Sequence, residues 1–413
     1  MTFLPLKFDN MRVAGIVAAS ALLLASGREC GAQQAVTRGD VVAAALARGP
    51  RIAFARADSS AAHAGLRMAR QFENPVVALS YSKAVPQQHV IMGIPLDYPW
   101  LRRARIGAAA FGLGAARYRF EFERAVISFE ADTAYTNALA AGRRAAYSRR
   151  TAREADSVLA LARVRRDGGD GSELDVQLAI VSGGQLASVA ERDSLDAMTA
   201  LLGVQALMGL PSDAPSLVLA DTLSPALPDA DNPPGTQLLV AAAEEDLRSA
   251  DQVLTLERRL LFAAPSLTVG FEKGDPTGVE NGSLPTIGIA LPLPLFNRNH
   301  GTILLAQAQR DRSQAALSLA KLEGAQQAAR ARRELALARS RLSRSEGLVV
   351  AANRVAQLSL LAYREGASTL PSVLEAQRVA RETLSQYVGD IAAARNAAAV
   401  AHLLTLTVHR NDQ

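Results

Sequence analysis

Short segments with alternating apolar residues run into very long stretches without proline. Apolar side chains occupy every second position from Ile287 to Leu293, the period of a strand with one apolar face. Pro292 and Pro294 cannot donate to a sheet ladder, so the strand must end or bend there, and Asn297 and Asn299 offer side-chain oxygens suited to capping a helix. The pattern predicts a long helix directly after this junction, over about 299–364.

The first half of the chain contains a similar junction, which indicates a duplication. Residues 90–105 pass from an apolar stretch through Pro95 and Pro99 into a second long helical segment. Each half therefore predicts helix, strand, strand, long helix, glycine turn and return helix. The predicted divisions are a signal peptide at 1–32, a first repeat at 33–215, a linker at 216–235, a second repeat at 236–408 and a tail at 409–413.

The predicted helix lengths indicate a wall of even height. In the first repeat we expect helices at 36–46 and 52–72, strands at 76–83 and 90–96, a long helix at 101–166 and a return helix at 173–208; in the second, a helix at 236–262, strands at 265–273 and 284–293, a long helix at 299–364 and a return helix at 369–406. A helix of about 66 residues spans about 100 Å. In each repeat, the short helix before the long helix and the return helix after it together have nearly the length of the long helix. We therefore expect two short helices stacked end to end beside each long one.

Composition agrees with narrow helix contacts. Apolar residues make up 49% of the chain and aromatic residues only 5%, which suits coiled coils better than a thick mixed core. Drift toward alanine in a GC-rich genome is an alternative cause of the composition, but it does not produce the periodicity. The 45 basic and 40 acidic residues are interleaved, giving a net charge of +5, which indicates a solvated helix surface and no nucleic-acid partner.

The N-terminus is typical of an exported protein. Lys7 and Arg12 precede an apolar segment at 13–25, and small residues follow up to Ala32, after which we expect cleavage. Lipidation of Cys30 is the alternative. No later apolar run reaches the roughly 20 residues of a membrane helix, so an exported chain of this kind is soluble, lipid-anchored or a β-barrel.

Four short strands cannot close a barrel alone, since about eight is the smallest usual number. A homo-oligomer would have to share the barrel, and three copies would supply twelve strands. The alternative is a pair of soluble hairpins packed on the helices.

Three segments resemble the TolC-like outer-membrane efflux channel family. They are IALPLPLFNRNHG at Ile289–Gly301, AYREGASTLPSVLEAQ at Ala362–Gln377, and DGGDGSELDVQLA at Asp167–Ala179. The resemblance implies a mainly α fold with a small β part: helical hairpins that form an α-barrel in the periplasm, and four strands per chain that contribute to a twelve-stranded transmembrane barrel of a homotrimer in the outer membrane. It also implies a periplasmic membrane-fusion adaptor and an inner-membrane transporter as partners.

The same resemblance implies roles for single residues. The periplasmic tip and adaptor-docking positions are Gly168, Gly171, Ser172, Gly366 and Ser368; the constriction and gate are Asp175, Tyr363, Ser372 and Glu375; the strand-to-helix junctions are Pro95, Pro292, Pro294 and Asn297. Tyr363 and Asp175 match a pair whose hydrogen bond closes the tip in some relatives, although a core aromatic and a first-turn helix acid are the alternatives. Glu375 matches a carboxylate ring, whereas Ser372 stands where another acid is common.

Nothing in the sequence indicates catalysis. The five histidines, at 63, 89, 300, 402 and 409, have no ligand spacing, and nucleophile-elbow, P-loop and GxGxxG motifs are absent. We therefore expect a passive duct without enzymatic activity, cofactor or metal site, whose cargo could be a drug, a metal ion or a polypeptide. The alternative is a soluble periplasmic coiled-coil adaptor or scaffold.

Overall fold

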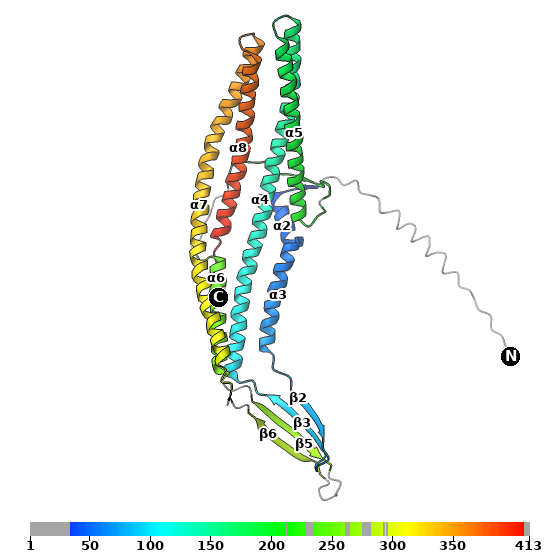
Figure 1. Cartoon of the computed structure of the whole chain (residues 1–413), viewed down its shortest axis with the longest axis vertical. Coiled ribbons are helices and arrows are strands. Elements are labelled where there is room, and N and C mark those ends of the chain that lie inside the picture. Colours follow the sequence, from blue (N-terminus) through cyan, green and yellow to red (C-terminus); the bar gives the residue numbers. More distant parts are fainter. Residues whose placement is uncertain are drawn as a thin grey trace, which may run out of the picture.

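The computed structural model describes residues 34–211, 213–227, 235–260, 265–274, 282–291, 294 and 296–408. The predicted signal peptide at 1–32, including Cys30, and Pro292 and the tail at 409–413 lie outside the described residues. The described chain is a long rod of helices with a small sheet at one end (Figure 1). Mainly helical structure with little sheet is what the sequence predicts.

The elements follow in chain order as β1 (Gln34–Val36), α2 (Arg38–Arg48), α3 (Pro50–Arg70), β2 (Val76–Tyr81), β3 (Gln88–Pro95), α4 (Pro99–Asp167), α5 (Glu173–Leu207), β4 (Leu217–Leu219), α6 (Leu238–Arg259), β5 (Ser266–Lys273), β6 (Leu284–Ala290), α7 (His300–Arg364) and α8 (Leu370–Thr405). The long helices α4 and α7 have 69 and 65 residues. Their bounds differ from the predicted ones by at most two residues, because no proline interrupts either.

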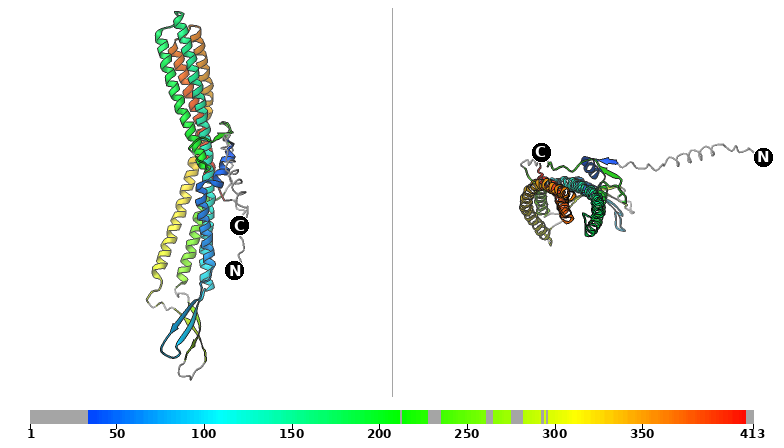
Figure 2. Two further views of the ribbon diagram at one scale, coloured as in Figure 1. Left: turned by 90° about the vertical axis from the view of Figure 1, so that its right-hand side faces the viewer. Right: turned by 90° about the horizontal axis from the view of Figure 1, so that it is seen from above.

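Short helices stack end to end beside the long ones, as predicted. Helices α3 and α5 pack along α4, and helices α6 and α8 pack along α7 (Figure 1). Seen from above, the helices form an open arc, with α2 and the strand β4 on its outer side (Figure 2). The buried positions of α4 are mostly alanine, which lets neighbouring helices approach closely without a thick core.

The larger sheet has the antiparallel order β2-β3-β5-β6. Residues that pair across antiparallel strands share a face, so the register sorts the side chains. One face carries the rows Ile94-Leu267-Ile289, Val77-Met92-Val269-Ile287 and Leu79-Val90-Phe271-Pro285; the other carries Val76-Gly93-Thr268-Gly288, Ala78-Ile91-Gly270-Thr286 and Ser80-His89-Glu272-Leu284. The first face is apolar except for a last row, Tyr81-Gln88-Lys273, and the second is mostly small or polar.

A second, two-stranded sheet was not predicted. Strand β1 pairs in parallel with β4, which lies in the segment predicted as a linker. The predicted helix start at Val36 is wrong, because Thr37 caps α2 in a reciprocal capping box with Asp40. Tyr135 of α4 fixes this sheet, since its hydroxyl donates to Val36 O at 3.0 Å and accepts from Asp221 N at 3.3 Å. Three-residue strands leave no periodicity to detect.

The junction before α7 also differs from the prediction. Asn297 does not cap the helix: its Oδ1 accepts from Asn299 N at 3.0 Å, and Asn299, at φ 60°, is the N-cap residue without a side-chain cap bond. The Asn299 amide donates instead to Glu257 O at 2.9 Å, which ties the start of α7 to α6. Strand β6 ends at Ala290, earlier than predicted.

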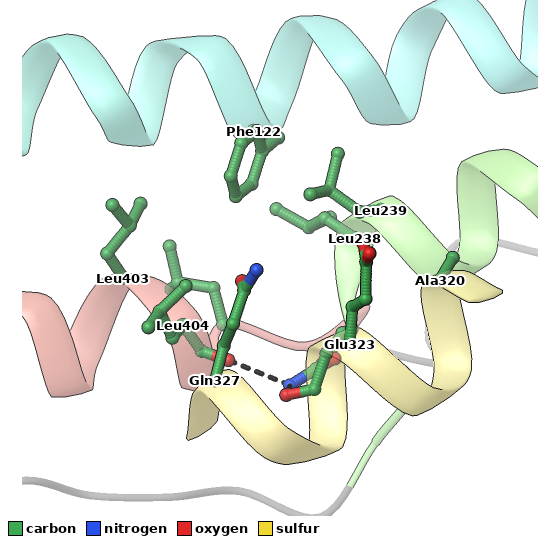
Figure 3. A pocket seen from close by; sticks show the side chains of 11 residues that line it. Phe122, Leu238, Leu239, Ala320, Glu323, Gln327, Leu403 and Leu404 are labelled. Atoms are coloured by element: carbon green, nitrogen blue, oxygen red, sulfur yellow. Dashed lines mark hydrogen bonds between the residues drawn. The ribbon is translucent and has the colours of Figure 1, made fainter. Parts of the chain in front are cut away.

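A small cavity marks the place where α6 and α8 meet end to end. It has a volume of about 120 Å³, and side chains from α4, α6, α7 and α8 converge on it, including Phe122, Leu238 and Leu403 (Figure 3). The Gln237 amide donates to Leu404 O at 2.9 Å and to Gly324 O at 3.3 Å. One side chain therefore joins the end of α8, the start of α6 and the middle of α7.

Gly324→Ala is expected to destabilise this joint, because a Cβ there would collide with Gln237 Oε1. Losing the hydrogen bonds of Gln237 costs about 1–3 kcal/mol, more than the gain in helix propensity of up to ~1 kcal/mol. Gly347→Ala on the same helix is the control, since its Cβ would meet open space. Thermal unfolding should show a lower apparent Tm for Gly324→Ala and an unchanged or higher one for Gly347→Ala; equal shifts would contradict the account.

Candidate functional site

The first interhelical turn at the tip of the rod joins α4 to α5. A reciprocal N-cap at the start of α5 stabilises this turn. Ser172 Oγ accepts from Asp175 N at 3.1 Å, and Asp175 Oδ2 accepts from Ser172 N at 3.3 Å, the two bonds of a capping box. A Cβ at Gly171 would lie 3.0 Å from Arg166 N, so glycine permits the tight approach. Gly168 and Ser172 are exposed at this turn.

The second turn joins α7 to α8 and lies beside the first at the same end of the rod (Figure 1). Gly366 adopts φ 76°, a left-handed conformation that favours glycine. Ser368 is partly buried, and Ser372 is exposed, with its hydroxyl 3.0 Å from that of Thr369. Both turns thus present mostly exposed, small or polar residues.

Arg165, which the sequence analysis did not single out, links the two turns. Its Nη1 donates to Tyr363 O, and its Nη2 donates to Asp170 O at 3.1 Å. The guanidinium carbon also lies 4.7 Å from the centroid of the Tyr363 ring, a cation–π contact. The only sequence signal was a basic residue in the last turn of a helix, which is ordinary because of the helix dipole.

Tyr363 is a core residue of the tip. It is 2% exposed and packs with Val158, Ala162, Leu370 and Val373. Its hydroxyl makes no hydrogen bond with any described residue, so the bond to Asp175 that the resemblance implies is not formed here. Asp175 is instead engaged in the cap of α5.

The Tyr363 hydroxyl is also electrostatically disfavoured from ionising. Burial, and then the nearby charge of Asp175, raise the pKa of the Tyr363 hydroxyl, against a smaller lowering by Arg165. The hydroxyl therefore stays neutral at physiological pH.

Glu375 lies exposed on α8 beyond the second turn, in an ion pair. Arg378 contacts both of its carboxylate oxygens, at 2.7 and 2.8 Å, and also reaches Glu382 at 2.6 Å. The hydrogen bonds from Arg378 lower the pKa of the Glu375 carboxyl. One arginine thus compensates part of the negative charge of two glutamates.

The remaining predicted positions lie at the other end of the helices. Pro95 is the last residue of β3, and Pro294 and Asn297 lie between β6 and α7. The described residues contain no group of three or more His, Cys, Asp or Glu side chains placed to hold a metal ion. Within that same part of the chain, no helix combines the length and apolar character that crossing a membrane requires.

Comparisons with known proteins bear on the fold. No protein-family model matches the chain. Over 152 residues it is 26% identical to the cobalt-zinc-cadmium resistance protein CzcC of Cupriavidus metallidurans, a match that covers 37% of this chain and only 36% of the length of CzcC.

Solved structures match over far more of the chain. A membrane protein from Pseudomonas aeruginosa superimposes with a TM-score of 0.77 at 21% identity, covering 89% of this chain and 93% of that one. The CmeC outer membrane channel of Campylobacter jejuni gives a TM-score of 0.75 at 15% identity, covering 89% and 85%. The chain therefore has the fold of the TolC-like outer-membrane channels, as the resemblance of its turns and junctions implies.

Proposed function

We propose that the protein is the outer-membrane exit duct of a tripartite efflux or type I secretion system. Three copies would close a twelve-stranded barrel in the outer membrane, and their helices would continue as a tunnel into the periplasm. The duct is passive and not an enzyme: an inner-membrane transporter drives the cargo, and a periplasmic adaptor docks at the tip residues Gly168, Gly171, Ser172, Gly366 and Ser368.

The observation that carries the proposal is the two-faced sheet. Its apolar face includes Leu79, Ile287 and Ile289, which are 74%, 77% and 72% exposed, and such a surface in water is a liability. The eight-residue strands β3 and β5 are about 26 Å long, slightly shorter than the roughly 9–11 residues with which a tilted strand typically crosses an outer membrane. Gly93, Gly270 and Gly288 share the opposite face, where small residues allow the sheet to curve.

Unpartnered apolar stripes support side-by-side assembly. Helix α7, at one side of the arc, exposes a run of leucines and valines, namely Leu304, Leu305, Leu319, Leu322, Leu337, Leu348, Val350, Val355, Leu358 and Leu361. At the other side, α3 exposes Phe54 and Met68, Phe72 is exposed just after α3, and α5 exposes Leu174, Val181 and Leu195. Two different surfaces that meet head to tail generate a closed ring, as a trimer requires.

Fractionation and planar-bilayer recording test the duct. The mature protein is expected in the outer-membrane fraction as a heat-modifiable trimer, and the purified trimer is expected to conduct ions. Recovery as a soluble periplasmic monomer would overturn the duct and favour the coiled-coil adaptor or scaffold. A trimer that binds membranes but does not conduct ions would support the proposed assembly and contradict the proposed channel.

Charge changes near the second turn test the constriction. Glu375→Gln is expected to lower the preference for cations and weaken block by multivalent cations. Arg378→Gln should do the reverse, about two- to fivefold, because it leaves Glu375 and Glu382 uncompensated. Reversal potentials and block in single-channel recordings measure both effects. If neither variant differs from wild type, Glu375 does not line the narrowest ring.

A further inference from the structure

A groove between three helices lies away from the two turns, and it includes Arg378 and Glu382 of the ion-pair group around Glu375. It has a volume of about 730 Å³ and is formed by α4, α5 and α8, midway along the helical part. This volume is typical of a site for a drug-sized molecule, which usually occupies about 300–1,000 Å³.

The groove has an excess of positive charge. Five arginines line it against two carboxylates. Arg150 is paired with Glu154, and Arg378 with Glu375 and Glu382. By contrast, the other three, Arg143, Arg144 and Arg381, form no hydrogen bond or ion pair with any residue in the described part of the chain.

Arg381 is the most informative of these because it is partly buried. Burial lowers the pKa of its guanidinium, more than Tyr147 and Glu382 raise it. A desolvated cation without a partner is unfavourable, and a carboxylate, sulfonate or phosphate that accepts two parallel hydrogen bonds relieves the cost best.

The uncharged part of the lining is about half apolar, and Ser148, Thr151, Ser182, Gln185 and Ser385 supply its polar part. Tyr147 of α4, Leu186 of α5, and Leu384 and Val388 of α8 contribute to its apolar part. A ligand that fits this combination needs an apolar body of aromatic or aliphatic rings and one anionic group. A hydrated metal cation satisfies neither requirement.

The groove opens on the inner side of the arc. A second groove of α4 and α5 lies beside β4, and Arg143 and Ala146 of α4 line both grooves. Only the second groove includes β4, whereas only the arginine groove includes α8. Because β4 lies on the outer side of the arc (Figure 2), the arginine groove faces what would be the tunnel in a trimer.

We propose that this groove binds amphipathic organic anions and that such molecules belong to the cargo of the duct. The binding site stands on the groove alone, whereas its role in transport rests on the proposed function. Arg381 and Arg144 hold the anionic group, and Tyr147 and the α5 and α8 side chains contact the apolar body.

Two probes with the same ring body separate charge recognition from apolar binding. The mature full-length protein in lipid nanodiscs is titrated with 8-anilinonaphthalene-1-sulfonate and, separately, with N-phenyl-1-naphthylamine, which lacks the sulfonate; empty nanodiscs give the background. The test variant is Arg144→Gln/Arg381→Gln. The matched control is Arg332→Gln/Arg341→Gln, which removes two exposed arginines of α7.

We expect the test variant to weaken sulfonate binding at least about tenfold, as loss of charged hydrogen bonds predicts, and to leave the uncharged probe and the control unchanged. Arg381→Lys keeps the charge but loses the two parallel hydrogen bonds, so it should bind the sulfonate more weakly than wild type and more tightly than the test variant, which guards against a folding defect. Equal sulfonate affinity in wild type and test variant, or equal loss of both probes, would overturn the site. If the wild-type protein does not conduct ions, the proposed duct is contradicted, but the proposed binding site for organic anions is not.

Discussion

Ile287→Arg is expected to prevent assembly in the outer membrane, whereas Thr286→Arg should leave the trimer largely intact. The two residues are neighbours in β6 and face opposite sides of the sheet. Ile287 belongs to the apolar row with Val77, Met92 and Val269, and it lies at the middle of its strand. Thr286 shares the small, polar face with Gly270.

The size of the effect follows from the position in lipid. An arginine on the lipid face near the midplane costs about 2–4 kcal/mol, and a trimer would carry three of them. On the other face, the same arginine would project into water. Gel migration with and without heating, together with membrane fractionation, measures the trimer. If Thr286→Arg were the damaging variant and Ile287→Arg harmless, the sheet would face the opposite way or would not lie in lipid.

The sequence predicted the long elements of the fold well. The two long helices have no internal proline, and their ends are marked by Pro99 and by glycine turns, so their length is determined locally. The period of two likewise located all four strands of the larger sheet. The stacking of short helices could be predicted from lengths alone, because each pair had to cover one long neighbour.

The features that the sequence did not predict depend on contacts between segments that are far apart in the chain. Strand β4 forms only because β1 lies beside it, and Tyr135 joins both through its hydroxyl, although 99 residues separate it from Val36. Arg165 could not be recognised for the same reason, since its partner Tyr363 is 198 residues away. A local sequence pattern indicates that a residue can cap a helix, pair in a sheet or pack in a core. It does not identify the residue that this side chain contacts.

The tip gives the second large expected effect. Arg165→Gln should open the contact between the two turns, because it removes a cation–π contact and the hydrogen bonds to Tyr363 O and Asp170 O, together about 2–3 kcal/mol. Amide hydrogen exchange at 166–172 and 363–369 is expected to accelerate about tenfold or more. In a conducting trimer, the open probability is expected to rise.

Tyr363→Phe is the matched variant, and it separates two accounts of the tip. It keeps the ring that Arg165 contacts and removes a buried hydroxyl without a hydrogen-bond partner among the described residues. Deleting an unsatisfied buried group is neutral or stabilising, by up to about 1 kcal/mol, so exchange at both turns should stay equal or slow. Tyr363→Phe could instead open the tip as far as Arg165→Gln does. That result would mean that a hydrogen bond between the Tyr363 hydroxyl and Asp175, and not the contacts of Arg165, holds the two turns together.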